Sequence, residues 1–366
     1  MSARFEWGLV VGKFAPLHRG HQHVIDTALS QCRHVVLLSY SNPEMPGCEP
    51  ARREGWLAAL YPQTTRLVVT NERLAIWFGD QQRQIPPNSA PDDVHRAFTA
   101  ELIERVVGRR LRRDACARSI PWSRGLVDAV FTSESYGEGF AAYLDRYFRR
   151  VDSSARPVQH VLVDAARTTV PTSGTSIRAN VHAERQWLHP SVYASFVDRI
   201  VCLGGESSGK STLTEALARA FGTCHAPEFG RELWVERGGT LEFDDLLLIG
   251  RTQVAREERL AGQSNRYLFC DTSPLTTLFY CLEQFGRAAS ELERLADREY
   301  ALTILCAPDF DFVQDGTRRE PEFRLKQHQW YLQELQRRGV PYIEVRGSVE
   351  ARIEQVDRAL VTRSGA

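Results

Sequence analysis

Residues Gly204 to Ser211 read GGESSGKS and match the pattern G-x-x-x-x-G-K-[ST] at every fixed position. In such a loop the glycines let backbone N–H groups converge on phosphate oxygens, and the following helix N-terminus adds a partial positive charge. We expect Lys210 to reach the outer phosphates and the Ser211 hydroxyl to hold Mg²⁺. The stretch predicts a nucleotide-binding site, and a glycine turn without chemistry is the competing interpretation. The residues expected at ATP are Gly204, Gly205, Glu206, Ser207, Ser208, Gly209, Lys210, Ser211 and Thr212.

A second candidate site lies in Gly12 to His21, which reads GKFAPLHRGH. Its two histidines, His18 and His21, directly follow an apolar run that predicts a strand. Ligands of open parallel sheets bind beyond the carboxyl ends of the strands, where this loop must lie. Two imidazoles there can donate hydrogen bonds to a phosphate during its transfer. A lone histidine is more often a surface or core residue, but a pair framed by Gly, Pro and Gly indicates a phosphate site.

Asp271 ends the apolar run Tyr267 to Cys270. A carboxylate at the end of a strand near a phosphate loop can contact Mg²⁺, its water shell or an acceptor hydroxyl. The same residue could instead cap a helix. The preceding phosphate loop favours the functional interpretation, in which Ser211 and Asp271 are the metal-contacting residues.

Two further polar segments follow the phosphate loop. Glu228, Arg231 and Glu232 follow a short expected strand, where they could hold a nucleoside through its ribose hydroxyls. Asp315, Arg318 and Arg319 lie in a polar loop before the last long helix, which suits a lid whose arginines close on phosphates. An exposed loop with solvated charges is the alternative for this second segment.

Strand-like apolar runs alternate with helical periodicity in both halves of the chain, which predicts βαβ units and parallel sheets. We therefore expect an α/β protein of two domains, a Rossmann-like one over 1–195 and a three-layer α/β/α one over 196–366. The expected strands are Trp7–Val11, Val35–Ser39, Thr65–Val69, Val127–Thr132, Val158–Asp164, Ile200–Leu203, Tyr267–Cys270, Leu302–Cys306 and Tyr342–Val345.

Composition restricts the class of protein. The 366 residues are 43% hydrophobic and carry 46 basic and 46 acidic side chains, so a general nucleic-acid or membrane-surface role is not favoured. The eight cysteines form no C-x-x-C pair, which argues against a zinc site or disulfide framework and favours a reducing cytoplasm. No signal pattern and no membrane-length apolar run is found. The basic cluster Arg109–Arg113 suits a solvated helix end, with a phosphate or RNA contact as the alternative.

Two motifs carry a resemblance to a known family. GKFAPLHRGH fits G-x-F-x-P-x-H-x-G-H, and Ser173, Thr175, Ile177 and Arg178 fit S-x-T-x-I-R, so the first half resembles the HxGH nucleotidyltransferases. The resemblance implies direct, Mg²⁺-dependent transfer of a nucleotidyl group from ATP to a phosphate acceptor. It implies that the two histidines stabilise charge on the α-phosphate. The other residues that it places at ATP are Gly12, Lys13, Phe14, Ser173, Thr175 and Arg178.

The pairing of this half with a phosphate-loop domain is similar to the NadR-type family of bifunctional nicotinamide-mononucleotide (NMN) adenylyltransferases and ribosylnicotinamide kinases. Further matching segments include EFGRE, CDTSPLTT and FVQDGTR. The resemblance implies that the second domain phosphorylates the 5′-hydroxyl of nicotinamide riboside, and that the first joins the product to AMP from ATP, releasing pyrophosphate and NAD. It implies a substrate pocket that includes Glu228, Arg231, Asp271, Phe312 and Asp315.

The chain also departs from the family pattern. Its first expected strand starts near residue 7, so we expect no DNA-binding domain before it. The region Asp80–Arg124 is longer and more basic than the usual connection, and Phe312 stands where the family often has Trp. Three questions stay open from sequence, namely whether the acceptors differ, whether the protein is chiefly a nucleotide sensor, and whether it forms a homo-oligomer.

Overall fold

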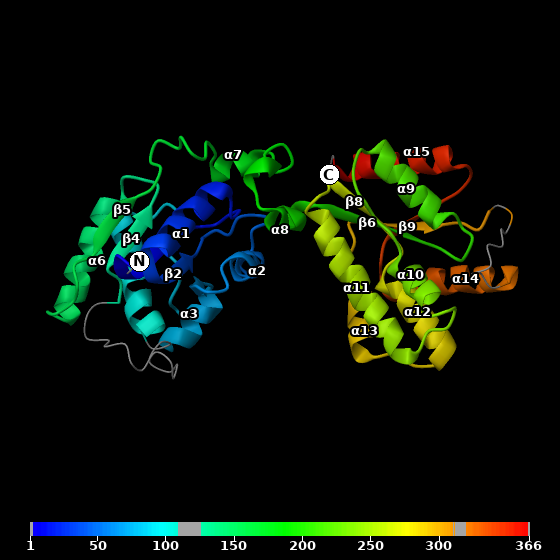
Figure 1. The fold of residues 1–366 in the computed structure, drawn as a ribbon, viewed down its shortest axis with the longest axis horizontal. Coiled ribbons are helices and arrows are strands. Elements are labelled where there is room, and N and C mark those ends of the chain that lie inside the picture. Colours follow the sequence, from blue (N-terminus) through cyan, green and yellow to red (C-terminus); the bar gives the residue numbers. More distant parts are fainter. Residues whose placement is uncertain (1–2, 109–125, 310, 312–319, 365–366) are drawn as a thin grey trace. The chain divides into compact units, whose positions relative to one another are not determined.

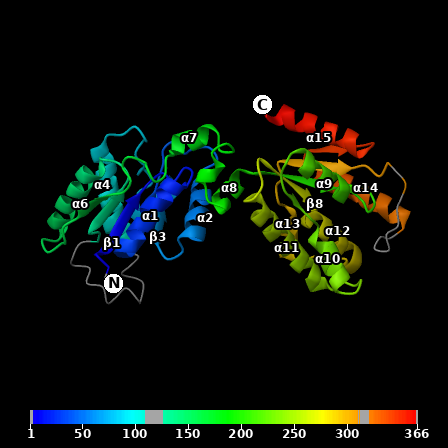
Figure 2. The ribbon, with the colours of Figure 1, turned by 45° about the horizontal axis from the view of Figure 1, so that its top comes forward.

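The computed structural model describes residues 3–108, 126–309, 311 and 320–364. The chain divides into two compact units, Met1–Val192 and Tyr193–Ala366, and each contains one parallel β-sheet (Figures 1 and 2). None of the helices in these described ranges combines the length and hydrophobicity that a bilayer-spanning segment needs.

The first unit is built on a five-stranded sheet with the order β3-β2-β1-β4-β5, in which all neighbours are parallel. Because β1 is central, the loop that follows it lies at the middle of the sheet's carboxyl edge. The order changes direction at β1, and such a switch point is where open α/β sheets bind ligands. The strands are β1 Phe5–Val11, β2 Cys32–Ser39, β3 Thr65–Val68, β4 Ala129–Thr132 and β5 Gln159–Leu162.

Side chains along each strand of this unit point alternately to the two faces of the sheet, and they form a core on each face. Trp7 and Leu9 of β1 join a buried cluster with Phe98 and Phe140, which lie on helices after β3 and β4. Side chains at every second strand position point to the same face, so the intervening residues pack on the other side, toward the first helix. The helices are α1 Arg19–Gln31, α2 Pro50–Leu60, α3 Asn71–Phe78, α4 Asp92–Leu102 with a π-helical continuation Ile103–Val107, α6 Gly137–Val151 and α7 Gly174–Ala179, and a 3₁₀ turn spans Arg185–Trp187.

The second unit repeats the design with the strand order β10-β9-β6-β8-β7, again all parallel. The strand before the glycine loop, β6, is the central one. Both sheets confirm the predicted two-domain α/β fold. The strands are β6 Asp198–Leu203, β7 His225–Ala226, β8 Tyr267–Asp271, β9 Leu302–Cys306 and β10 Tyr342–Val345.

Helices cover both faces of this sheet (Figure 1). Leu213 and Leu217 from the helix after the glycine loop pack with Val356 and Leu360 of the last helix against β6 and β9. The remaining long helices lie on the opposite face. The helices are α8 Pro190–Tyr193 at the junction of the units, α9 Lys210–Ala220, α10 Phe229–Glu236, α11 Phe243–Ala261, α12 Pro274–Phe285, α13 Ser290–Ala296, α14 Pro321–Arg337 and α15 Val349–Ser364, and a 3₁₀ turn spans Ala194–Phe196.

Two sequence predictions about local structure were wrong in detail. The strand expected over Val158–Asp164 is shorter, because Asp164 has a positive φ of 47° and its carboxylate accepts hydrogen bonds from the backbone N–H groups of Thr168, Thr169 and Val170. The proline-rich, polar segment Gln81–Asp93 predicts a loop from sequence, but α4 begins at Asp92. Two aspartates in the first turn of α4 favour the positive end of the helix dipole.

Candidate active sites

His18 is fixed in place by the start of α1. It is the N-cap, and its Nδ1 accepts hydrogen bonds from the backbone N–H groups of Gly20, at 3.1 Å, and His21, at 3.4 Å. A neutral imidazole that accepts at Nδ1 carries its proton on Nε2. His18 therefore presents an Nε2–H donor while its other nitrogen is occupied.

The two histidines of the motif are stacked, with ring centroids 3.7 Å apart. The fully buried ring of Phe14 meets His21 edge-on at 5.1 Å. Burial lowers the pKa of His18 to about 4, helped by the charges of Arg167 and Arg178. Burial and the neighbouring His18 lower the pKa of His21 as well. Both rings are thus neutral donors near pH 7, and Phe14 supports them from within the core.

We expect these histidines to make stability depend on pH. Because the pKa of His18 is about 4 in the folded protein and near 6.5 when unfolded, the unfolded state binds more protons between these values, so stability falls as the pH falls. The loss for His18 between pH 7 and pH 5 is about 2 kcal/mol. Urea unfolding at pH 7 and pH 5 measures it. His18→Asn keeps an N-cap without titrating, so an equal pH dependence in that variant would contradict the expectation.

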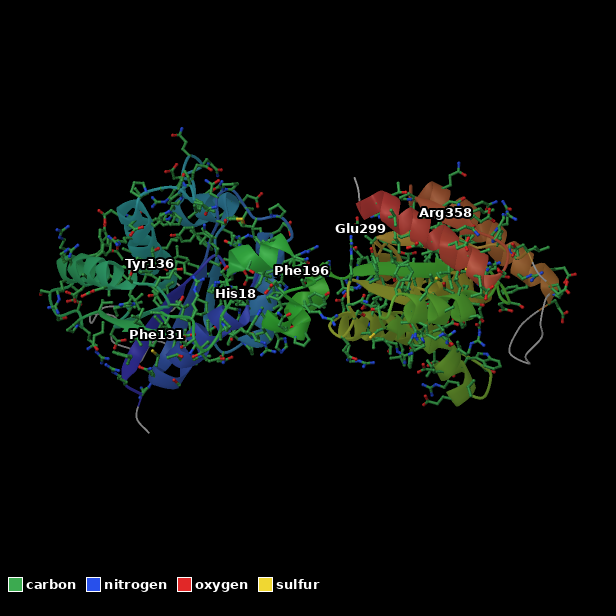
Figure 3. All side chains as sticks on the ribbon, turned by 90° about the horizontal axis from the view of Figure 1, so that it is seen from above. His18, Phe131, Tyr136, Phe196, Glu299 and Arg358 are labelled. Atoms are coloured by element: carbon green, nitrogen blue, oxygen red, sulfur yellow. The ribbon has the colours of Figure 1, made fainter. Side chains whose placement is uncertain are left out.

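The second transferase motif folds back beside the first. Ser173 caps α7 by accepting from the N–H of Ser176, and Arg178 on that helix donates to the carbonyl of Ala15 at 2.5 Å and to the Thr175 hydroxyl at 3.1 Å. A Cβ placed on Gly174 would lie 3.9 Å from Nε2 of His18. The structure therefore brings together two motifs that are about 150 residues apart in sequence. Figure 3 labels His18 among the side chains of this unit.

The first unit has a cavity of about 210 Å³ that opens beside Gly12 and Lys13. It is smaller than the cavity of the second unit, which measures about 380 Å³ and would hold a nucleoside. Burial, together with the charge of Arg178, lowers the pKa of Lys13 at its edge. The hydroxyl of Tyr40 and Nδ1 of His95 form a hydrogen bond of 3.1 Å in its wall. The residues that complete this lining were not predicted from sequence, and they are Val11, Tyr40, Asn88, Asp92, His95, Arg96, Thr99, Tyr136 and Phe140. Several of them belong to the unusual region after residue 80.

The glycine loop of the second unit joins β6 to α9 as predicted. Gly204 has a φ of +147° and Gly209 a φ of +78°, and a Cβ on Gly204 would lie 2.8 Å from the carbonyl oxygen of Cys306. Only glycine fits such backbone and such close approach. Nζ of Lys210 donates to the carbonyl of Gly205 at 2.9 Å, which folds the side chain back over the loop. Ser211 and Thr212 lie in the first turn of α9.

Asp271 is buried at the carboxyl end of β8. The cap of the next helix is Ser273, so the alternative that Asp271 is a helix cap is wrong. Burial raises the pKa of Asp271, while Lys210 and a hydrogen bond with Ser211 oppose that rise. Its Oδ1 has no hydrogen-bond partner among the described residues. A buried, unpartnered carboxylate oxygen beside a serine hydroxyl fits the hard-oxygen ligands that Mg²⁺ prefers.

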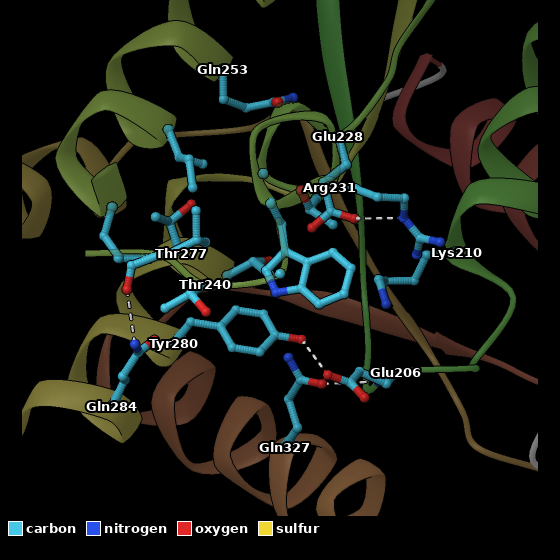
Figure 4. Close-up of a pocket in the computed structure, with 18 of the residues that line it drawn as sticks. Glu206, Lys210, Glu228, Arg231, Thr240, Gln253, Thr277, Tyr280, Gln284 and Gln327 are labelled. Carbon is cyan, nitrogen blue, oxygen red and sulfur yellow. Dashed lines mark hydrogen bonds and ion pairs between the residues drawn. The ribbon is translucent and has the colours of Figure 1, made fainter. Parts of the chain in front are cut away.

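The larger cavity lies beside the glycine loop (Figure 4). Glu228 and Arg231 line it together with Lys210, as the sequence suggested. Burial and the charge of Asp271 raise the pKa of Glu228. Glu206 is held in the wall, because its carboxylate accepts from the Tyr280 hydroxyl and its backbone N–H donates to Gln327, both at 2.9 Å.

Several lining residues of this cavity were missed from sequence. They come from α10, the segment after it, α11, α12 and α14, and no local motif joins these segments. Only the segment CDTSPLTT had drawn attention to the start of α12. The missed residues are Gly230, Trp234, Gly239, Thr240, Leu241, Leu246, Ile249, Gln253, Thr272, Thr276, Thr277, Tyr280, Gln284 and Gln327. Phe312, Asp315, Arg318, Arg319 and the basic cluster 109–113 lie outside the described residues.

The chain is similar to known proteins in both of its units. Residues 199–352 match the AAA domain family, which covers the glycine loop and Asp271. The trifunctional NAD biosynthesis/regulator protein NadR of Escherichia coli is 28% identical over 85% of this chain and 71% of its own length. NadR of Salmonella typhimurium is likewise 28% identical over the same shares. Over most of its length the chain is therefore similar to NadR proteins.

Solved NadR structures share the fold of this chain. NadR in complex with NR superimposes with a TM-score of 0.62 at 20% identity, covering 95% of this chain and 92% of that one. NadR in complex with NAD and AMP-PNP gives a TM-score of 0.63 at 18% identity, with 100% and 98% covered. The likeness extends over both units, so the two-domain α/β fold is that of NadR.

Proposed function

We propose that this NadR-type chain is a bifunctional enzyme of NAD biosynthesis. Its second unit phosphorylates nicotinamide riboside with ATP, and its first unit transfers AMP from ATP to the resulting NMN, giving NAD and pyrophosphate. The observation that carries the proposal is that each unit has its own phosphate motif at the central strand's carboxyl end, beside its own cavity. The names of the relatives, which refer to NAD biosynthesis, support it.

In the kinase unit the nucleoside occupies the larger cavity. Its base rests among the apolar and aromatic side chains, such as Trp234 and Leu246, and its ribose hydroxyls meet Glu228 and Arg231. A carboxylate with a raised pKa suits a group that takes a proton from the 5′-hydroxyl near neutral pH, and Glu228 is such a group. Lys210 and the loop N–H groups stabilise the charge of the transferring phosphoryl group.

In the transferase unit the ATP phosphates lie between the two motifs. Neutral His18 and His21 donate hydrogen bonds to the α-phosphate, and Lys13, Ser173, Thr175 and Arg178 hold the outer phosphates. Gly12 permits close approach of the backbone. NMN occupies the smaller cavity beside Lys13, with its phosphate toward the α-phosphate of ATP. Positioning of the two reactants and charge stabilisation then supply the rate enhancement.

Mg²⁺ is the expected metal at both sites. In the kinase unit Ser211 and Asp271 would hold it, since the Oδ1 atom of Asp271 is buried without a hydrogen bond among the described residues. When bound, Mg²⁺ neutralises charge on the phosphate oxygens.

We also propose that the transferase domain ends, and the kinase domain begins, near residue 195. The seven cysteines within the described residues are free thiols, which supports a reducing cytoplasm.

The decisive experiment supplies the purified chain with ATP, Mg²⁺ and nicotinamide riboside alone. We expect NMN to appear first and NAD with pyrophosphate afterwards. Chromatography of samples taken over time measures the three products. Absence of both products would refute the proposal. Phosphate-acceptor panels with pyrophosphate release as the readout would identify a transferase of other specificity, and tight NAD binding without turnover would identify a sensor instead.

A further inference from the structure

Two arginines, Arg53 and Arg352, are the largest side chains that the described core buries almost completely. Burying a guanidinium is costly unless hydrogen bonds satisfy its donors. Neither residue belongs to a motif that indicated chemistry. Their partners therefore show what each arginine stabilises.

Arg352 on α15 bonds to three loops at the carboxyl ends of three adjacent strands. Its guanidinium donates to the carbonyls of Ser208 after β6 at 2.8 Å, Ala307 after β9 at 3.0 Å and Gly347 after β10 at 3.0 Å. It also pairs with the carboxylate of Asp309. The first of these carbonyls belongs to the glycine loop itself.

Arg53 on α2 makes the corresponding contacts in the first unit. Its Nη1 donates to the carbonyl of Lys13 at 3.2 Å and to the hydroxyl of Ser39 at 2.9 Å, and that hydroxyl donates to the same carbonyl at 3.0 Å. Its Nη2 donates to both carboxylate oxygens of Glu44 at 2.7 Å. The Lys13 carbonyl that Arg53 binds belongs to the loop GKFAPLHRGH, one residue after Gly12.

A planar trans peptide points its C=O and the next N–H in opposite directions. Holding the Ser208 carbonyl behind the loop fixes the direction of the Gly209 N–H, and holding the Lys13 carbonyl fixes that of Phe14. Anion sites of this kind work only when their N–H groups are directed beforehand at the phosphate oxygens. We propose that Arg53 and Arg352 are positioning residues, one for each active site, that fix the phosphate loops in their binding conformation.

This inference rests on the proposed two activities, and the two sites in one chain supply its controls. In Arg352→Lys, the single ammonium group cannot reach all three carbonyls. We therefore expect kcat/KM for ATP in the kinase reaction to fall at least about tenfold, because a small displacement of groups that position a substrate lowers the rate strongly. The KM for nicotinamide riboside should stay within twofold, since Arg352 does not line that cavity. Adenylyl transfer should be unchanged, which shows that the chain is folded. Arg53→Lys should give the reverse pattern.

Arg298→Lys is the matched control, because Arg298 is another mostly buried, ion-paired arginine of the second unit, but its partners are Glu257 and Glu258. It should leave kcat/KM for ATP within twofold. The inference is overturned if Arg352→Lys and Arg53→Lys do the same, if each variant lowers both activities equally, or if Arg298→Lys matches the loss in Arg352→Lys.

A measurement independent of activity separates this inference from the proposed function. Amide hydrogen exchange by mass spectrometry should be faster over 204–209 in Arg352→Lys and over 12–15 in Arg53→Lys than in the parent chain. If the parent makes neither NMN nor NAD, the proposed function fails, and this exchange result still decides the positioning role. Unchanged exchange in both variants would overturn it.

Discussion

Replacing Lys210 by alanine is expected to lower the turnover of nicotinamide riboside phosphorylation by roughly 10²–10³-fold, as does the loss of other charge-stabilising donors. The structure places this ammonium over the glycine loop, donating to the Gly205 carbonyl, and at the edge of the nucleoside cavity. No other lysine in the described part of the second unit lines this cavity. Initial rates of NMN formation measure the effect.

Lys326→Ala is the matched control for this prediction. Lys326 is an exposed lysine of the same unit that pairs with Glu283 on the surface, and its loss should leave the kinase rate within about twofold, since exposed ion pairs contribute little. Adenylyl transfer supplied directly with NMN should be unchanged in Lys210→Ala. If that variant is folded and loses both activities, the two sites are not independent.

His21→Ala is expected to lower adenylyl transfer by about 10²–10⁴-fold. His21 packs against His18 and Phe14 and stays neutral because its pKa is lowered, and a neutral imidazole keeps one N–H that can donate a hydrogen bond to a phosphate. Its removal takes away that donor and the ring on which His18 stacks. NAD formation from ATP and NMN is the measurement.

His23→Ala provides the control, because His23 lies on the same helix two residues later and outside both motifs. His18→Asn separates two roles of the neighbouring histidine, since asparagine retains the helix cap but not the Nε2–H donor. We expect His18→Asn to be folded and nearly inactive in transfer, while its kinase activity is retained. Transfer at the parental rate in both His18→Asn and His21→Ala would show that the histidines do not act on the phosphate.

Local features of the sequence determined the fold class and the phosphate motifs. Apolar runs such as Leu302–Cys306 are buried on both faces of a parallel sheet, so their composition alone marks them as strands. The glycines of the loop are required by the positive φ angles of its backbone, as at Gly204 and Gly209. The cap of α7 is equally local, because the Ser173 side chain accepts from the N–H of Ser176, three residues later. Each of these depends on residues close together in the chain.

Only the tertiary structure decided which distant residues complete each site. Tyr280 reaches Glu206 because α12 packs beside the glycine loop, and His95 reaches Tyr40 because α4 packs over the end of β2. Arg53 and Arg352 look like ordinary surface-helix residues in sequence, and their roles appear only when the carbonyls of Lys13 and Ser208 are seen to meet them. Such contacts join segments up to 144 residues apart, and no local pattern in the sequence encodes them.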